Sequence, residues 1–349
     1  GLKTKLQFGK VTVTSIFTQQ RGQSTSTSVT GGAQITKFDI QADNYDVNRH
    51  FFLSHYFADN YDRWMSNLPA IQSPVIINRV EVWVTNRSKD FTTTRDVVGY
   101  MDLGEATPYN DAKWGTFPNA FPANGANRLY EQIATGPLAN QVRSSFSTVQ
   151  TLEGAPYNLD KIQDFQYLAN ARQLNSNEFT VHPNLGYISL NAALNNDEIL
   201  CVAFEYTING VAYQVGEFAL DVPDDPANPK ILNLKMLKGA TITTHLPIWD
   251  LMMKNVYSLG AYNVQEDKFY LNVVYADDLT GADYTYLPVQ GEPNIGTNVL
   301  IRTLNLDNVN VQGEPTPDGV FDFLENKTIL PKNGRIIFPV REPFGSHLE

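Results

Sequence analysis

The side chains best suited by type and spacing to chemistry lie between Asp307 and Asp322, a segment rich in carboxylate and amide oxygens. Calcium takes six to eight oxygen ligands, and a loop of this composition could supply them. The EF-hand spacing fails, because counting from Asn308 puts Gly319 at the twelfth position, where that motif requires Glu. A plain acidic surface loop is favoured over a calcium site. The calcium hypothesis names four ligands: Asp307, Asn310, Asp318 and Asp322.

The residue types that serve other catalytic sites are scattered along the chain. His50 and His55 are close in sequence, but five residues turn a helix by about 140°, so they would not share a helix face. Cys201 lies in a fully apolar run that predicts a buried strand, where a thiol acts as a small hydrophobic side chain. Nucleophile-elbow, phosphate-loop and zinc-protease motifs do not occur. We therefore expect no enzyme, and no cofactor other than the calcium ion considered above.

Charge and composition exclude several classes of partner. The 349 residues include 26 Lys and Arg against 37 Asp and Glu, for a net charge of −11. No basic stripe of the kind that binds nucleic acid is visible, and anionic membrane surfaces are disfavoured for the same reason. No run approaches the roughly 18 apolar residues of a membrane helix. The chain is long enough for two or three domains, and its start at Gly1 within an alternating pattern suggests a fragment.

Two helices are predicted from periodicity and end signals. The first begins near Asp46, which can cap it, and stops at Pro69. Its apolar residues are spaced three or four apart and form one face: Leu53, Phe57, Tyr61, Trp64 and Leu68. The second helix has Pro247 in its first turn and ends at Gly260. A weaker helical pattern covers residues 159–168.

Most of the remaining chain has the alternation that is typical of β-strands. Predicted strands cover residues 76–85, 97–103, 269–275, 299–304 and 335–338. The clearest hairpin runs from Cys201 to Val215, because Asn209-Gly210 at its centre favours the positive φ angles of a type I′ turn. Two segments rich in Pro, Asn, Asp and Gly, 105–126 and 219–229, are predicted loops.

The N-terminal residues form a pattern of their own. Residues 2–8 and 11–20 alternate apolar and polar side chains on either side of Gly9-Lys10, which predicts a strand, a tight turn and a strand. A lone hairpin is marginal in water, so its arms need neighbouring strands. Residues 21–32 are almost all Gly, Ser, Thr and Gln and predict a linker without order of its own.

An internal repeat organises the rest of the chain. Residues in the stretch 180–190 match residues in 328–338 at a constant offset, 328 − 180 = 148. Both stretches predict a strand, a Pro/Gly turn and a strand, and a predicted helix precedes the strands in each half. We therefore predict an α+β, β-dominated fold with two duplicated helix-plus-sheet modules of sandwich type. The predicted boundaries are 1–32 for the hairpin and linker, 33–191 for the first module with a loop insertion at 105–168, 192–246 for a connecting hairpin region, and 247–349 for the second module.

Several specific sequence strings carry a family resemblance. They are Leu2–Gln20 with its Lys-Leu-Gln-Phe-Gly-Lys core, Asn48–Leu53, Val80–Asn86, Asp102–Glu105, Leu185–Leu190, Trp249–Leu259, Asp318–Phe323, Arg335–Pro339 and Glu342–Gly345. Together they resemble the SprA (Sov) family of the Bacteroidetes, the outer-membrane translocon of the type IX secretion system, which is also tied to gliding motility. The resemblance covers essentially the whole chain.

The resemblance implies an internal fragment of a much larger protein, whose family fold is a very large transmembrane β-barrel that conducts folded cargo across the outer membrane. It carries over no catalytic residues, and it implies other secretion-system subunits and secreted cargo proteins as partners. The two modules would then be inserted in the barrel. Because outer-membrane barrels have short periplasmic turns, the short Gly9-Lys10 turn would put everything from Arg21 onward at the cell surface, as a cap or plug. A periplasmic position is the alternative.

Two functions follow from these observations. The first is a non-catalytic gating region of the translocon, in which Trp83 and Trp114 would mark a contact patch for partners if both are exposed on one face. For Trp83 a core position is the favoured interpretation. The second is a surface adhesin or carbohydrate-binding β-domain, since the chain has 17 Tyr and carries Trp114 in a predicted loop.

Overall fold

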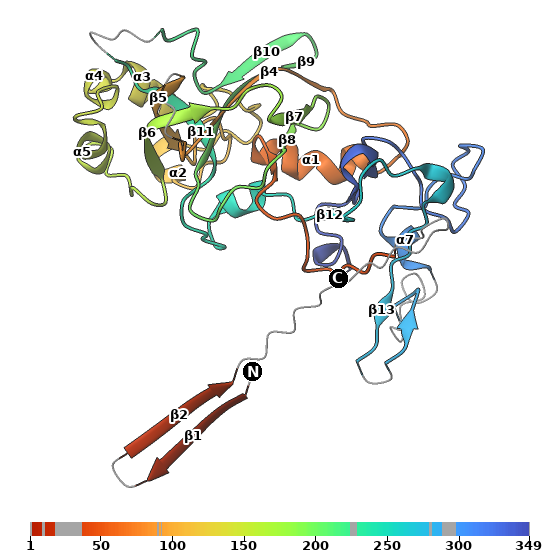
Figure 1. The fold of residues 1–349 in the computed structure, drawn as a ribbon. Helices are drawn as coiled ribbons and strands as arrows, with labels where there is room; N and C mark the ends of the chain where they lie inside the picture. The colour runs from red at the N-terminus through yellow and green to blue at the C-terminus, as the bar shows by residue number, and fades with distance from the viewer. Residues whose placement is uncertain are drawn as a thin grey trace. The chain divides into compact units, whose positions relative to one another are not determined.

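The computed structural model describes residues 2–8, 11–17, 37–88, 91, 93–223, 229–278, 281–287 and 298–348. The chain divides into two compact units, residues 1–39 and 40–349. In the first unit, β1 (Leu2–Phe8) pairs antiparallel with β2 (Val11–Phe17), with Leu2 opposite Phe17 (Figure 1). The predicted strand pair is confirmed. The predicted turn at Gly9-Lys10 and the predicted linker 21–32 lie outside the described residues.

A small closed barrel organises the second unit. Its five strands are β4 (Val75–Val84), β5 (Thr94–Tyr100), β6 (Phe165–Gln173), β9 (Leu200–Ile208) and β11 (Leu232–Lys238). Around the barrel the order is β9, β11, β5, β6 and β4, and β4 pairs with β9 to close it. The pairs are antiparallel except β11 with β5, which is parallel. The second unit is β-dominated, as predicted.

The strand β10 (Val211–Val215) extends the barrel sheet beside β9. The residues between them, Asn209 and Gly210, have positive φ angles of 51° and 82°. Ile208 lies opposite Val211, so the loop has the length and the backbone that a type I′ turn requires. The predicted hairpin is confirmed.

Mostly small and aliphatic side chains, together with Trp83, fill the barrel interior. The cluster inside it includes Trp83, Val97, Leu168, Ala171, Cys201, Ala203, Leu232, Leu234 and Met236. Gly99 leaves room for these side chains, because a Cβ at Gly99 would lie 2.3 Å from Cys201 Sγ. Cys201 is fully buried, and burial raises the pKa of its thiol. The interpretation of Cys201 as a core residue is confirmed.

The helix α1 (His55–Met65) packs in the hydrophobic cluster outside the barrel. The ring of Phe57 lies 5.9 Å from that of Phe204 and 5.3 Å from that of Tyr206, both on β9. The predicted helix from Asp46 to Pro69 is therefore only partly right. Its first part is instead the strand β3 (His50–Phe52), because these residues are buried and pair with another strand.

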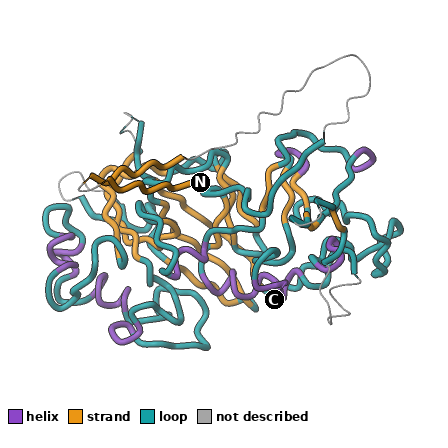
Figure 2. The backbone as a smooth tube through the Cα atoms, turned by 90° about the horizontal axis from the view of Figure 1, so that it is seen from below, coloured by secondary structure: helices purple, strands orange, loops and turns teal. Residues whose placement is uncertain are grey.

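The connection from β5 to β6 holds four short helices. They are α2 (Asp111–Trp114), α3 (Leu129–Thr135), α4 (Ala139–Val142) and α5 (Thr148–Glu153). The predicted loop 105–126 thus contains one of them. The predicted helix at 159–168 is wrong, because Phe165 begins β6 and pairs with Tyr100. Figure 2 shows how loops and short helical turns surround the strands.

Two three-stranded sheets have the same strand order and register. In one, β8 (Tyr187–Leu190) lies between β3 and β7 (Phe179–His182); in the other, β16 (Arg335–Ile337) lies between β12 (Val256–Ser258) and β15 (Ile329–Leu330). His50 pairs with Ser189 in the first sheet, and Val256 pairs with Ile337 in the second. The central strands are thus offset by 337 − 189 = 148 residues, and the outer strands β7 and β15 by the same number, 329 − 181 = 148. The other outer strands, β3 and β12, are offset by 256 − 50 = 206.

Backbone hydrogen bonds repeat at the same offsets. Leu53 N donates to Gly186 O at 2.9 Å, and Leu259 N donates to Gly334 O at 2.8 Å. Both glycines have positive φ angles, 65° and 57°. The two hairpins with the 148-residue offset therefore form matching sheets, which supports a duplication. We call these two sheets the sheet repeats.

The elements around the second sheet repeat differ from the prediction. The predicted helix that ends at Gly260 is limited to the 3-10 turn η1 (Pro247–Leu251), since residues 256–258 form β12. Of the predicted strand 269–275 only Tyr275 lies in a strand, β13 (Tyr275–Ala276), which pairs with β14 (Asp283–Tyr284).

The predicted strand 299–304 is also wrong, because these residues form the short helix α7 (Leu300–Thr303). The side chains of Leu300, Ile301 and Leu304 are buried, and their spacing suits one face of a helix. An apolar run this short is ambiguous between strand and helix by pattern alone.

Candidate functional site

The predicted calcium ligands lie in a loop whose carboxylates accept hydrogen bonds from backbone amides. Asp307 accepts from the amide of Asp318 at 2.9 Å and from that of Gly319 at 3.1 Å. Asp322, on the other arm of the loop, accepts a hydrogen bond from the amide of Asn308 at 2.6 Å. The two aspartates therefore hold the two arms of the loop together.

The other two predicted ligands have similar roles. Asn310 Oδ1 accepts from the amides of Gln312 and Glu314, and Asp318 Oδ1 accepts from that of Val320. Within the described ranges, no group of three or more His, Cys, Asp or Glu side chains could hold a metal ion. The side-chain oxygens of all four residues accept hydrogen bonds from backbone amides of the same loop. The calcium hypothesis stays a prediction.

Asp322 gives this loop an expected pH dependence. Burial raises the pKa of Asp322, the nearby Asp307 and Asp318 add to this, and amide hydrogen bonds oppose it, so that the pKa is about 6. Because the folded state then binds the proton more tightly than the unfolded state, stability falls as the pH rises from about 4 to about 6. We expect the difference in thermal midpoint between wild type and Asp322→Asn to change across this window and to be constant above about pH 7.

Calcium supplies the second arm of the same experiment. An ion bound by the native loop would raise the midpoint of the wild type and not that of Asp322→Asn, since ligands stabilise the state that binds them. A pH-independent difference between the two proteins would contradict the assigned role of Asp322.

Trp83 and Trp114 do not form a surface patch, which corrects the prediction for partner contacts. Trp83 is 1% exposed and lies inside the barrel, whereas Trp114 is 5% exposed and belongs to the outer cluster. The favoured core interpretation of Trp83 is confirmed. The Pro/Asn/Gly surroundings of Trp114 predict an exposed loop, whereas the residue lies in α2 and its side chain is buried.

A Ser-His-Asp contact appears that sequence reasoning missed. His50 Nδ1 lies 2.7 Å from Ser189 Oγ, and His50 Nε2 lies 3.2 Å from Asp46 Oδ2. The strand pair β3–β8 sets His50 opposite Ser189, which no local motif could reveal. These residue types occur in hydrolase triads, where the serine must reach a substrate.

The three residues of this contact are largely buried, and Asp46 is hydrogen-bonded to two arginines as well. His50 is 1% exposed and Ser189 is 8% exposed. Asp46 also accepts from Arg49 at 3.1 Å and from Arg335 at 2.5 Å. Burial raises the pKa of Asp46, but hydrogen bonds and charge from His50 and Arg335 outweigh it and lower the pKa to about 2. The cluster joins the first sheet repeat to β16 of the second.

A buried charge cluster joins the barrel to α1. Lys235 on β11 is fully buried, and its Nζ lies 2.8 Å from Glu105 Oε1. His55 Nδ1 lies 3.0 Å from the same oxygen, and His55 Nε2 lies 2.8 Å from Pro247 O. Burial raises the pKa of Glu105, but Lys235 and His55 lower it by more than burial raises it, so the pKa is about 2, below the ordinary value of 4.5. Glu105 is therefore a buried carboxylate held between Lys235 and His55.

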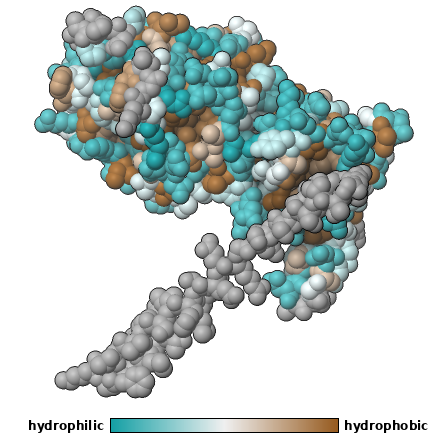
Figure 3. Space-filling model, in the orientation of Figure 1, coloured by the Kyte–Doolittle hydropathy of each residue, from teal (hydrophilic) through white to brown (hydrophobic). Residues whose placement is uncertain are grey.

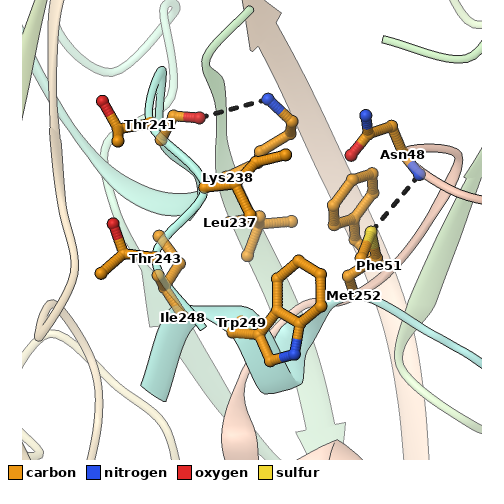
Figure 4. A pocket seen from close by; sticks show the side chains of 11 residues that line it. Asn48, Phe51, Leu237, Lys238, Thr241, Thr243, Ile248, Trp249 and Met252 are labelled. Carbon is orange, nitrogen blue, oxygen red and sulfur yellow. Dashed lines mark hydrogen bonds between the residues drawn. The ribbon is translucent and has the colours of Figure 1, made fainter. Parts of the chain in front are cut away.

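A shallow pocket lies between β3, the end of β11 and η1 (Figure 4). Phe51, Leu237, Trp249 and Met252 supply its apolar side chains, and Lys238 lies at its edge. Lys238 Nζ donates to the carbonyls of residues 196, 198 and 239 at 2.7 to 3.2 Å. Burial lowers the pKa of Lys238 to about 8, against the effect of nearby acidic residues. The ammonium is thus directed at backbone carbonyls.

The described part of the chain contains no helix with the length and apolar character needed to span a membrane.

Comparison with known proteins gives one family match. The model of the SprA_N family, described as motility related/secretion protein, matches residues 1–193. No curated protein matches the chain. The matched residues include β1, β2, α1, β4 to β6 and the whole first sheet repeat. Since the match covers more than half of the chain, the protein belongs to the SprA_N family of motility-related and secretion proteins.

Proposed function

We propose that this chain is a non-catalytic part of a protein-conducting outer-membrane translocon of the type IX secretion system, and that it serves both secretion and gliding motility. The observation that carries the proposal is the family match, which begins at residue 1 and runs through β1 and β2 into the barrel and the first sheet repeat. The match thus joins the hairpin and residues 40–193 of the second unit in one family region. The strings that resemble the SprA (Sov) family support the same function.

The hairpin supports an origin in a larger barrel. Its two strands have seven residues each and pair over their full length, and the first unit holds no further described strand. A two-stranded hairpin is marginal in water, whereas strands on both sides would complete it. We infer that these strands come from a parent barrel in which the second unit is inserted.

The hairpin also suggests the side of the membrane. Only Gly9 and Lys10 separate Phe8 from Val11, and outer-membrane barrels have short turns on the periplasmic side. β2 would then run outward, and the second unit would be a cap or plug at the cell surface. A periplasmic position is the competing arrangement.

The second unit suits a structural role beside a pore. Its Ser-His-Asp contact is enclosed and bound to arginines, which favours a structural over a catalytic role. Hydrophilic residues cover most of the face seen in Figure 3, with smaller hydrophobic areas between them. The net charge of −11 disfavours nucleic acid as a partner, and we propose secretion-system subunits and cargo proteins as partners instead.

Cleavage of intact cells tests the side of the membrane. A recognition site for a specific protease is inserted after Phe146, whose side chain is 96% exposed between α4 and α5. We expect protease added to intact cells to cleave the chain at this site, because the cap arrangement places the loop on the outer surface of the cell. The matched control is the same insertion between Gly9 and Lys10, which should resist cleavage until the outer membrane is permeabilised. The reverse pattern would establish the periplasmic position.

A further inference from the structure

Residues 270–274, which precede the hairpin β13–β14, have no strand partner in the described part of the chain. Phe269, at the end of the 3-10 turn η2 (Glu266–Lys268), has extended backbone angles, φ −102° and ψ 129°. Among the residues that the structure describes, the backbone groups of 270–274 have no hydrogen-bond partner. The segment leads into β13, which projects with β14 from the second unit (Figure 1). Its backbone is therefore open to a further strand.

The side chains of this segment alternate as in a half-buried strand. Leu271 is 7% exposed, whereas Tyr270 is 66% and Val274 is 47% exposed. The alternation ends at Tyr275, which begins β13 and is 39% exposed. Tyr and Val are residues that strands favour. The face with Leu271 is thus packed, and the face with Tyr270 and Val274 is exposed. Side chains of a neighbouring strand would pack beside Tyr270 and Val274.

The first sheet repeat has a paired strand at the corresponding place. There, the first long strand after β3 is β4, and β9 pairs with it from Val75 to Val84. In the second repeat, the first strand after β12 is the short β13, which pairs with β14 at Tyr275 and Ala276. In the first repeat β9 pairs along the whole of β4, whereas in the second repeat no described strand pairs with residues 270–274.

Acidic side chains surround this edge. Glu266 and Asp267 precede the segment, Asp278 and Asp283 follow it, and all four are exposed. None of the four takes part in an ion pair within the described residues. A second copy paired antiparallel about Asn272 would set Asp267 opposite Asp277, and like charges opposite each other destabilise a strand pair. A strand with basic ends is the complementary occupant.

We propose that residues 270–275 bind an extended segment of a partner protein by β-strand addition. The partner segment carries apolar or β-branched residues at alternate positions and Lys or Arg at both ends. Its backbone pairs with the open edge, its apolar side chains cover Tyr270 and Val274, and its basic ends lie beside the four acidic residues. This surface is independent of the side of the membrane and of the translocon role.

The test uses a fluorescent peptide with alternating Val and Thr at its centre and two lysines at each end. Anisotropy titration with the full 349-residue chain should give saturable binding that weakens as salt is added. The matched peptide with glutamates at its ends should bind roughly tenfold more weakly or worse. Hydrogen exchange should slow at residues 270–275 when the lysine peptide is bound.

Charge-reversal variants locate the site. Asp267→Lys with Asp278→Lys should weaken binding of the lysine peptide roughly tenfold. The control, Glu131→Lys with Glu153→Lys, reverses two exposed acidic residues on α3 and α5 and should leave binding unchanged. Val274→Pro, which removes an edge donor at an exposed position, should abolish binding.

Three outcomes would overturn the proposal. They are no binding of the lysine peptide, equal binding of the glutamate peptide, and slowed exchange at residues other than 270–275. A dimer of the chain with protected residues 270–275 would make a second copy the occupant and would also reject it. A negative result here leaves the cell-cleavage result unaffected, so the two proposals fail separately.

Discussion

Lys235→Met is expected to lower the free energy of unfolding by about 3 to 5 kcal/mol, as measured by urea denaturation at neutral pH. Lys235 is fully buried, and its ammonium lies 2.8 Å from a carboxylate oxygen of Glu105. Met nearly preserves the volume of the side chain, so packing changes little. The loss comes from Glu105, which stays buried and charged with only His55 beside it.

Two further variants separate this effect from a general loss of charge. Lys254→Met removes a partly exposed pair with Asp250 and should cost at most about 0.5 kcal/mol. Adding Glu105→Gln to Lys235→Met should recover part of the loss, because the double variant has no buried unpaired charge. Losses that simply add in the double variant would contradict the coupling.

The pH gives an independent check. In the wild type the pKa of Glu105 is about 2, below its ordinary value of 4.5, so the carboxylate contributes stability that is lost as the pH falls through this range. Without Lys235, burial raises the pKa of Glu105, so Glu105 becomes protonated as the pH falls. Protonation removes the buried unpaired charge and so restores part of the stability of the variant. The stability gap between wild type and Lys235→Met should therefore narrow from pH 7 to about pH 4. A constant gap would argue against an unpaired Glu105.

Gly186→Ala should cost about 3 kcal/mol by the same measurement. Gly186 has a φ angle of 65°, and the left-handed region costs an L-residue roughly 1 to 2 kcal/mol. The new Cβ would also lie 2.4 Å from Cγ of Phe57. That ring is fully buried against Phe204 and Tyr206 and has little room to move, so overpacking adds roughly 1 to 3 kcal/mol.

The second sheet repeat supplies a matched pair of variants. Gly334 is the equivalent of Gly186, with a φ angle of 57°, and a Cβ there would lie 2.0 Å from Ala261 O. Gly334→Ala should therefore be as costly as Gly186→Ala. Gly260 has a φ angle of 67° but no atom within 4 Å of a new Cβ, so Gly260→Ala should cost only about 1 kcal/mol. Equal costs for all three would show that contacts contribute nothing.

Local patterns predicted the strands and hairpins whose signals are contained in a few residues. Asn209-Gly210 between alternating runs predicted the β9–β10 hairpin, because a two-residue loop with positive φ angles has few alternatives. The 148-residue offset predicted two hairpins that the structure forms with matching register. The N-terminal strand pair was predicted in the same way.

Patterns failed where a segment is buried on several sides. Residues 50–52 are all buried between β8 and the segment near Met252, so their apolar character resembles that of a buried helix. The same holds for residues 256–258 in β12. In both places a strand far away in sequence, and not the local spacing, decides the conformation.

The sequence by itself determined the Asn209-Gly210 turn, the repeat, the acidic balance and the family, because each of these depends on neighbouring residues or on a direct match. Only the tertiary structure decided which strands pair, and so closed the barrel between β4 and β9 and joined β11 to β5. Alternating strands are interchangeable by pattern, so their partners depend on the packing of the whole unit. The same pairing brings Ser189 to His50 and Lys235 to Glu105, and it leaves the backbone of residues 270–274 without a hydrogen-bond partner among the described residues.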